Sequence, residues 1–229
     1  MSGMRRRHFL TLSAGSLGGM LVYTLDRKPV CVHAQDQDKA ASGKPVKVAL
    51  RFFTEQEALA VAAAAAQIFP ADESGPGANE AGVVIYIDRQ LAGPYGRDRY
   101  RFIQPPFETG VPEQGYQGKA TPAGIYREGL RQIRGLHQLS TNEQHAALTR
   151  IEKTSFFQVL KTHTIEGMFC DPMHGGNADL IGWQLIGFPG PRMSYADEVD
   201  RYHGREFRPK PMSLQQIVGH PVKPSEDEA

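Results

Sequence analysis

The chain has 229 residues, a length typical of one medium-sized domain with extended ends. Hydrophobic residues make up 40% of the chain and charged residues 22%, a composition that favours a globular fold with its own core over a disordered or collagen-like chain. The 26 basic and 25 acidic residues nearly cancel, which argues against a nucleic-acid-binding protein that depends on broad positive charge.

The N-terminal segment has the pattern of a bacterial export signal. A run of arginines is followed by a moderately apolar stretch, residues 10–25, that contains several glycines and serines. The motif is of the twin-arginine type and consists of Arg6, Arg7, Phe9 and Leu10. The apolar stretch is short for a membrane-spanning helix, although an uncleaved anchor is an alternative.

A small-residue cleavage site ends at Ala34, so residues 1–34 are predicted to be the signal and residues 35–50 a polar linker. Loss of residues 1–34 would remove five basic residues and one acidic residue, and the mature chain would be mildly acidic. Twin-arginine transport carries folded proteins. A protein that uses it usually contains a cofactor inserted in the cytoplasm, or is bound to a partner that does.

Residues 51–204 predict a mainly α fold, a small irregular helical domain with long Gly/Pro-rich loops and extended termini. Thr54 and Glu57 form a capping box that opens a helix over residues 55–69. Residues 80–92 contain strand-forming residues, but their apolar side chains also fit one helical face, and we predict a helix. The apolar positions of that face are Val84, Ile87 and Leu91.

Glycine and proline recur among aromatic residues between positions 93 and 120. A long irregular segment of this kind could wrap around its own core or lie on another protein. Helices are then predicted from Pro122, and from the Ser140 and Glu143 capping box through Ile151. Helical spacing continues through Phe156, Leu160 and Ile165, and Asn177 is a predicted cap for a short turn. The Pro-rich and charged tail, residues 205–229, is expected to be partly disordered or ordered by a partner.

No nucleotide-binding, serine-hydrolase, zinc-protease or haem-attachment motif is present in the sequence. Soft or borderline metal ligands do gather near residue 170, namely His163, Cys170, Met173 and His174. An exported metal-binding redox protein that uses Cys170 and His174 is therefore one hypothesis. The alternative is a tight turn between two helices, in which Asp171 and His174 hydrogen-bond to local backbone.

Cys170 would be the single cysteine of the mature chain, because Cys31 leaves with the predicted signal. An unpaired thiol in an oxidising compartment indicates either an intermolecular disulfide or a buried, inert cysteine. Both alternatives stay open at this stage.

Several motifs occur together in a recognisable order. The first is the twin-arginine leader, and the second is the helix that starts at residues 53–57 and ends with Ile68-Phe69-Pro70-Ala71-Asp72. The third is the turn at residues 75–78, and the fourth is the run from Glu166 to Gly190. Within that run the signature residues are Glu166, Phe169, Cys170, Asp171, His174, Gly175, Gly176, Asn177 and Trp183. Together these motifs resemble the small subunit (subunit 3, or gamma) of membrane-bound gluconate 2-dehydrogenase and related flavoprotein sugar dehydrogenases, over roughly residues 50–192.

This resemblance implies a non-catalytic subunit. Its expected partners are a large FAD-containing dehydrogenase subunit of the glucose-methanol-choline type, a possible cytochrome c subunit that carries haem c, and the twin-arginine translocase. The expected location is the periplasm, at the inner membrane through those partners. No catalytic, cofactor-binding or metal-binding residue is expected in this chain. The signature residues are expected to contact the partner, to shape the turn in which they lie, or to do both.

Overall fold

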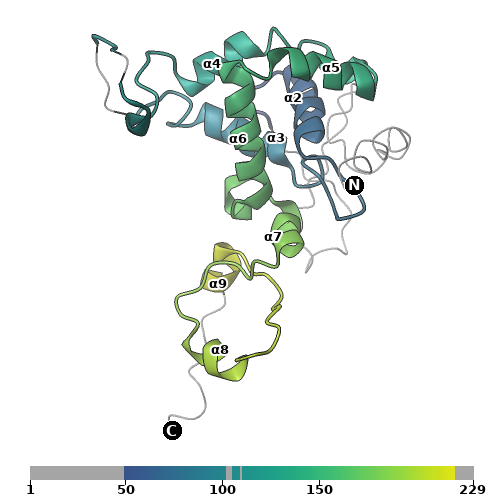
Figure 1. Cartoon of the computed structure of the whole chain (residues 1–229), viewed down its shortest axis with the longest axis vertical. Helices are drawn as coiled ribbons and strands as arrows, with labels where there is room; N and C mark the ends of the chain where they lie inside the picture. The colour runs from purple at the N-terminus through teal and green to yellow at the C-terminus, as the bar shows by residue number, and fades with distance from the viewer. Residues whose placement is uncertain (1–48, 102–104, 109, 220–229) are drawn as a thin grey trace.

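The computed structural model describes residues 49–101, 105–108 and 110–219 (Figure 1). The predicted twin-arginine motif, nearly all of the linker and the last ten residues of the tail lie outside these ranges. The regular elements within the described ranges are all helical, which confirms the predicted mainly α fold. Within the same ranges no helix has the length and apolar character needed to cross a membrane.

Helix α2, Glu55–Ile68, contributes most of its residues to the core and contacts α3, α5 and α6. The predicted capping box is present, because the Thr54 hydroxyl accepts from the Glu57 N–H and the Glu57 carboxylate accepts from the Thr54 N–H. Most of the alanines of α2 are buried. Because their side chains are small, the neighbouring helices can pack closely around α2.

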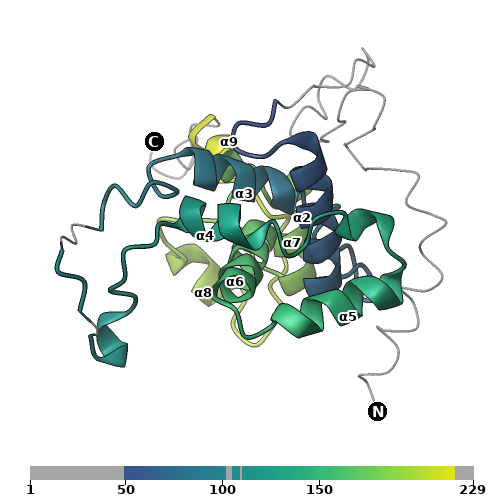
Figure 2. The ribbon, with the colours of Figure 1, turned by 90° about the horizontal axis from the view of Figure 1, so that it is seen from above.

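Along the described chain, α2 is followed by α3 (Val83–Ala92), α4 (Pro122–Gly129), α5 (Thr141–Ile151), α6 (Ser155–Phe169), α7 (Ile181–Ile186), α8 (Ala196–Arg201) and α9 (Leu214–Gly219). In the view from above, α6 is seen end-on, with α3 and α4 on one side of it and α2 and α5 towards the other (Figure 2). The helix predicted for residues 80–92 is confirmed, and its apolar face is buried. The Ser140 and Glu143 capping box of α5 is confirmed as well.

Helix α6 turns a different face to the core from the one predicted. Phe156 and Leu160 are buried as expected, but Ile165 is 41% exposed. From Leu160, the inward positions fall three and four residues later, at His163 and Thr164. Ile165 lies about 140° around the helix from that face, so its predicted core position is wrong.

A buried carboxylate joins the chain before α2 to helix α3. The side chain of Asp88 is 2% exposed and accepts hydrogen bonds from the backbone N–H groups of Arg51, Phe52 and Phe53 at 2.8 to 2.9 Å. Arg127 of α4 reinforces this corner, since its guanidinium lies 2.9 Å from the Glu57 carboxylate and covers the ring of Phe52. The N-terminal edge of the body is thus fixed by interactions between residues that are far apart in the sequence.

Two long segments project from the helical body. We call residues 93–120 the arm, and residues 190–213 the C-terminal loop. The arm extends to one side of the body in two perpendicular views and is closed at its base by the Ala123 N–H, which donates to the Gly96 carbonyl at 3.0 Å (Figures 1 and 2). The predicted irregular segment is confirmed, and most of it lies away from the core.

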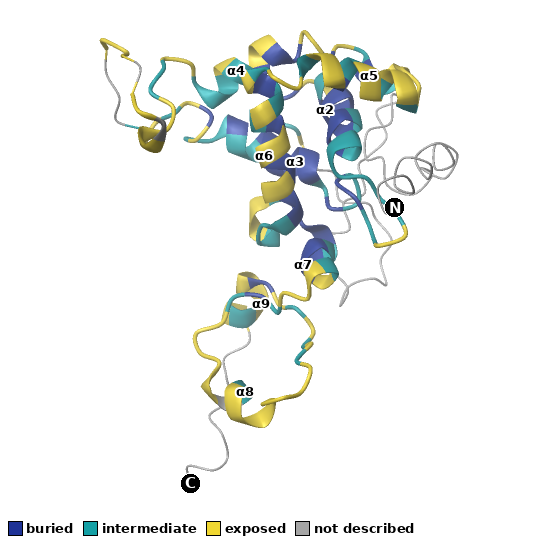
Figure 3. Ribbon diagram, in the orientation of Figure 1, coloured by how far each residue is buried: buried dark blue, intermediate teal, exposed yellow. Residues whose placement is uncertain are grey.

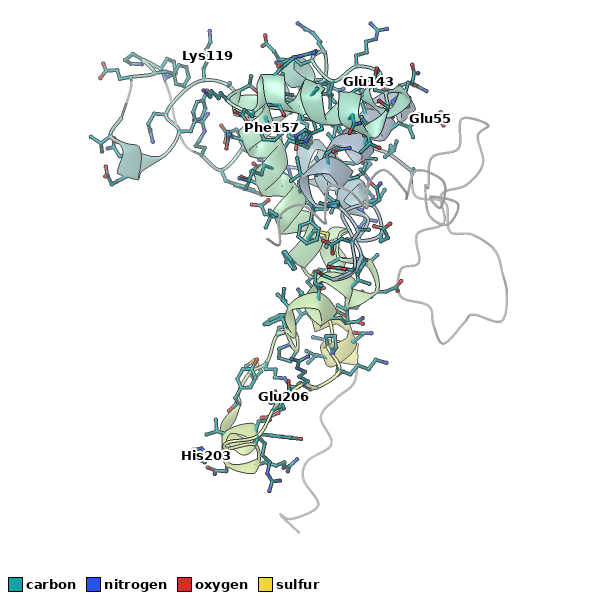
Figure 4. The ribbon with its side chains drawn as sticks, turned by 45° about the vertical axis from the view of Figure 1, so that its right-hand side comes forward. Glu55, Lys119, Glu143, Phe157, His203 and Glu206 are labelled. Atoms are coloured by element: carbon teal, nitrogen blue, oxygen red, sulfur yellow. The ribbon has the colours of Figure 1, made fainter. Side chains whose placement is uncertain are left out.

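The C-terminal loop hangs below α7 and is largely exposed (Figure 3). It is closed at its base by the Met212 N–H, which donates to the Pro189 carbonyl at 3.2 Å. His203 and Glu206 lie at its far end, well away from Phe157 on α6 (Figure 4). The predicted tail begins inside this loop, and its described part ends with α9.

The Asp88 carboxylate provides a test of this fold. Asp88→Ala leaves three backbone N–H groups without their acceptor and is expected to lower the free energy of unfolding by roughly 3 kcal/mol. Asp88→Asn keeps one accepting oxygen, so its expected loss is about half as large. Urea denaturation followed by circular dichroism measures both values. Glu128→Gln, on the exposed side of α4, is the control, and an equal loss in all three variants would contradict this role of Asp88.

Candidate functional site

The signature residues lie where α6 ends, and their main contacts are with the backbone of that helix. The last carbonyl groups of a helix have no partner within the helix. Here the Asn177 N–H donates to the Gly167 carbonyl at 2.8 Å, and the Trp183 indole N–H donates to the Phe169 carbonyl at 2.7 Å. The segment that follows α6 thus folds back and supplies the missing donors.

The side chain of Asn177 connects the end of α6 to the start of α7. Its Nδ2 group donates to the Cys170 carbonyl at 2.8 Å, and its Oδ1 atom accepts from the Gly182 N–H at 2.8 Å. Asn177 is fully buried and has a left-handed backbone, a conformation that asparagine tolerates better than most residues. The predicted cap at Asn177 is confirmed, and it acts on both helices.

Two buried glycines, Gly176 of the signature and Gly182 of α7, bring backbone into direct contact with α6. A Cβ atom on Gly176 would lie 2.2 Å from the Gly167 carbonyl oxygen, and one on Gly182 would lie 1.9 Å from the Met168 carbonyl oxygen. No side chain fits at such distances. Gly175 has a positive φ and ends the short turn of residues 172–174.

Phe169 and Asp171 extend these contacts to other segments. The ring of Phe169 packs edge-on against Phe69, with centroids 5.9 Å apart. The Asp171 carboxylate accepts from the Met173 N–H at 3.1 Å and from the Leu214 N–H at 2.7 Å. The first of these two bonds is the predicted local one. The second ties α9 to the signature across 43 residues of sequence, and the sequence pattern did not reveal it.

His174 is exposed, and its backbone N–H donates to the Asp171 carbonyl at 2.9 Å, which is the predicted bond to local backbone. Cys170 is a half-buried free thiol whose sulfur lies 3.7 Å from the Gly167 carbonyl oxygen. Burial raises the pKa of Cys170 to about 11, so the thiol is protonated and weakly reactive near neutral pH. The inert-cysteine alternative gains support from this environment, and an intermolecular disulfide stays a prediction.

The predicted metal ligands do not come together as a site. Both ring nitrogens of His163 are engaged, since Nε2 lies 2.7 Å from the Tyr95 hydroxyl and Nδ1 lies 2.9 Å from the Tyr126 hydroxyl. Within the part of the chain that the structure describes, no group of three or more His, Cys, Asp or Glu side chains is placed to hold a metal ion. The hypothesis of a metal-binding redox protein receives no support from this geometry.

His163 belongs to a polar cluster that sequence reasoning missed. The cluster comprises Tyr86 of α3, Tyr95 of the arm, Tyr126 of α4, and His163 and Glu166 of α6. Tyr126 stacks on the imidazole with ring centroids 5.6 Å apart, and the Tyr86 hydroxyl donates to the Glu166 carboxylate at 2.9 Å. We call this group the tyrosine–histidine cluster. Its members are far apart in sequence, so no local spacing could have revealed it.

Burial keeps the inner part of this cluster uncharged. His163 is 1% exposed, and desolvation lowers its pKa to about 4. Desolvation also raises the pKa of Tyr126 well above its ordinary value, and raises that of Tyr86, where the hydrogen bond to Glu166 adds to the effect. The imidazole and the phenols therefore remain neutral near pH 7.

The close contacts at the end of α6 give a ranking of glycine substitutions. Gly176→Ala and Gly182→Ala place a methyl group against fixed backbone and are expected to lower the free energy of unfolding by more than about 3 kcal/mol, or to prevent folding. Gly187→Ala is the matched control, because its Cβ meets open space and only the positive φ costs about 1 kcal/mol. Thermal denaturation measures all three. Equal stability of Gly182→Ala and Gly187→Ala would contradict the close packing on α6.

The comparison with known proteins identifies a family. The family model described as Gluconate 2-dehydrogenase subunit 3 matches residues 55–190, which is more than half of the chain. The matched range includes α2 to α7, the tyrosine–histidine cluster and the signature. No curated protein and no solved structure matches the chain. The match over residues 55–190 places this chain in the gluconate 2-dehydrogenase subunit 3 family.

Proposed function

We propose that the chain is the accessory and export subunit of a periplasmic FAD-dependent sugar or sugar-acid dehydrogenase, with gluconate 2-dehydrogenase as the first candidate. The observation that carries this proposal is the family match over residues 55–190, which includes the whole helical body. The twin-arginine motif at Arg6 and Arg7 supports an export role. A folded export route suits a subunit that accompanies a flavoprotein loaded with its cofactor.

The proposed division of labour leaves the chemistry to other subunits. FAD would be held by a large subunit of the glucose-methanol-choline type, and haem c by a possible cytochrome subunit. The complex would lie in the periplasm and associate with the inner membrane through those partners. The present chain would contribute a recognition surface for the flavoprotein, support its maturation, and carry the signal read by the twin-arginine translocase.

Exposed apolar side chains on the two projecting segments support a role in assembly. On the arm they are Tyr100, Phe107, Val111 and Tyr116, and on the C-terminal loop they are Met193, Tyr195, Val199 and Tyr202. Aromatic residues and methionine are enriched where proteins meet, and exposed apolar groups that recur along one segment often mark such surfaces. Both segments extend away from the body, where a partner can reach them (Figure 3).

The signature has a different part in this proposal. Asn177, Trp183 and the two buried glycines bond or pack within the chain, so they shape the turn rather than face a partner. Glu166 and His174 are the exposed members of the signature, and they are the ones available for contact.

Purification of the tagged full-length protein from its native periplasmic or membrane fraction tests the assembly directly. Co-purification of a flavoprotein, with the absorption spectrum of FAD and gluconate- or sugar-dependent dye reduction, is expected. Mass spectrometry would identify the partner, and the substrate profile would identify the sugar. A bound chromophore or dye-reducing activity in the isolated chain would contradict the accessory role.

The export role makes a separate prediction. Arg6→Lys combined with Arg7→Lys is expected to retain both this chain and its flavoprotein partner in the cytoplasm, because the translocase reads the paired guanidinium groups. Cell fractionation followed by immunoblotting of both subunits measures the result. Arg27→Lys, a basic residue outside the motif, is the control. If the partner reaches the periplasm normally beside the double variant, the carrier role is wrong.

The two projecting segments can be tested separately as contact surfaces. Met193→Asp with Val199→Asp alters the C-terminal loop, and Tyr100→Ser with Phe107→Ser alters the arm. If a segment lies in the interface, its double variant loses buried apolar contacts. That variant is then expected to bind the flavoprotein at least tenfold more weakly. Quantitative co-purification at several expression levels measures this. Leu139→Ser, an exposed leucine before α5, is the control, and wild-type binding by both double variants would rule out both segments.

A further inference from the structure

The buried imidazole of His163 contacts the base of the arm. Tyr95 is the third residue of the arm, and its hydroxyl group lies 2.7 Å from Nε2 of His163. Its ring packs edge-on against the imidazole, with centroids 5.3 Å apart. The next residue, Gly96, accepts the Ala123 N–H that closes the arm's base. The imidazole and the Ala123–Gly96 bond together hold the base of the arm against the helical body.

The directions of the hydrogen bonds around His163 follow from burial. The Tyr126 hydroxyl is fully buried, and Nδ1 of His163 is its one partner among the described residues. A buried hydroxyl must donate its proton, so Tyr126 donates to Nδ1. His163 is then neutral with its proton on Nε2, and that N–H donates to the Tyr95 oxygen. Tyr95 is 44% exposed and can give its own proton to water.

We propose that His163 is an acid-sensitive latch, which holds the base of the arm on α6 while the imidazole is neutral and releases it when the imidazole is protonated. The inference rests on the hydrogen-bonded chain from Tyr126 through His163 to Tyr95, and it is independent of the proposed export role. What the latch controls is the placement of the arm and of the exposed aromatic side chains that the arm carries.

Protonation is disfavoured in the closed arrangement. An imidazolium has a proton on Nδ1, so Tyr126 could no longer donate there, and its buried hydroxyl proton would lose its acceptor. That loss carries the full desolvation penalty of a buried polar group. Release of Tyr95 lets water reach the ring and solvate the charge.

The surroundings supply no effective counter-charge. The titratable groups around the cluster are Tyr86 on α3, Tyr95 and Asp98 on the arm, Tyr126 on α4, and Glu166 and Cys170 on or beside α6. Helix α2 also packs on α6, but its buried residues are all apolar. The Glu166 carboxylate is already engaged by the Tyr86 hydroxyl. Burial is the cause that lowers the pKa of His163 to about 4, and no nearby carboxylate offsets it.

The pH range of the latch follows from these values. In the released state the histidine regains an ordinary pKa of about 6.5, so the closed state binds fewer protons than the open state. The closed state has its full advantage above about pH 6.5 and loses it as the pH falls towards about 4. Between pH 7.5 and 5, the opening equilibrium of the arm's base is expected to rise roughly 30-fold.

Hydrogen–deuterium exchange of the full-length chain at pH 7.5 and pH 5 tests the latch, with labelling times scaled for intrinsic exchange. Peptides that cover residues 93–101 and 119–124 are expected to lose protection at pH 5 by roughly the 30-fold rise in opening. Peptides of α2 and α3 are expected to keep theirs. Loss of protection in α2 together with the arm would indicate global unfolding and would overturn the proposal, as would an unchanged arm.

Three variants separate the latch from a merely structural contact. Tyr95→Phe removes the hydroxyl and is expected to raise exchange at the arm's base already at pH 7.5. His163→Gln cannot titrate in this range and is expected to abolish the pH response. Tyr100→Phe, an exposed tyrosine of the same arm, is the control and should match the wild type. A pH response of wild-type size in His163→Gln would overturn the proposal, and if that variant does not fold, the comparison of Tyr95→Phe with Tyr100→Phe decides.

Discussion

The backbone carbonyl groups at the C-terminal end of α6 are the constraint around which much of this molecule is arranged. They have no partner within the helix, and the chain itself supplies the donors. Asn177 and Trp183 do so from residues that come after a tight turn. The turn can come close enough only because Gly176 and Gly182 lack side chains. The positions of Asn177, Trp183 and Gly176 within the signature are thus explained by the closure of one helix.

The middle of the same helix organises a second set of contacts. One turn and a half before its end, α6 presents His163 to the interior, where an aliphatic residue would have been expected. The imidazole joins three separate elements, because α4 and the arm each bring a tyrosine hydroxyl to one of its nitrogens, and α6 itself carries the ring. A polar group at this position fixes the geometry more sharply than an apolar one, since hydrogen bonds have both direction and length.

Local features of the fold could be predicted from the sequence, and non-local polar contacts could not. The capping boxes at Thr54 and Ser140 act within one helical turn, so their residues are recognisable at fixed spacing. The helix over residues 83–92 was recognisable because its apolar positions repeat with helical period. Ile165 was misplaced because the inward positions beside it are taken by His163 and Thr164, which look like surface residues in a sequence. The bond from Leu214 to Asp171 joins segments that only the tertiary fold brings together.

The contrast between the body and its projections bears on how such a subunit can work. Within the body, the polar and glycine residues singled out above make contacts inside the chain. Asp88 accepts hydrogen bonds from three backbone N–H groups, Asn177 joins two helices, and Gly176 and Gly182 pack directly against backbone. A surface that engages another protein must instead leave apolar groups exposed in the free chain. Exposed apolar groups recur along the arm and the C-terminal loop, and each of these segments is held at its base by a small number of hydrogen bonds. The rigid body therefore fixes where the two segments start, and the few bonds at each base determine how firmly each segment is held.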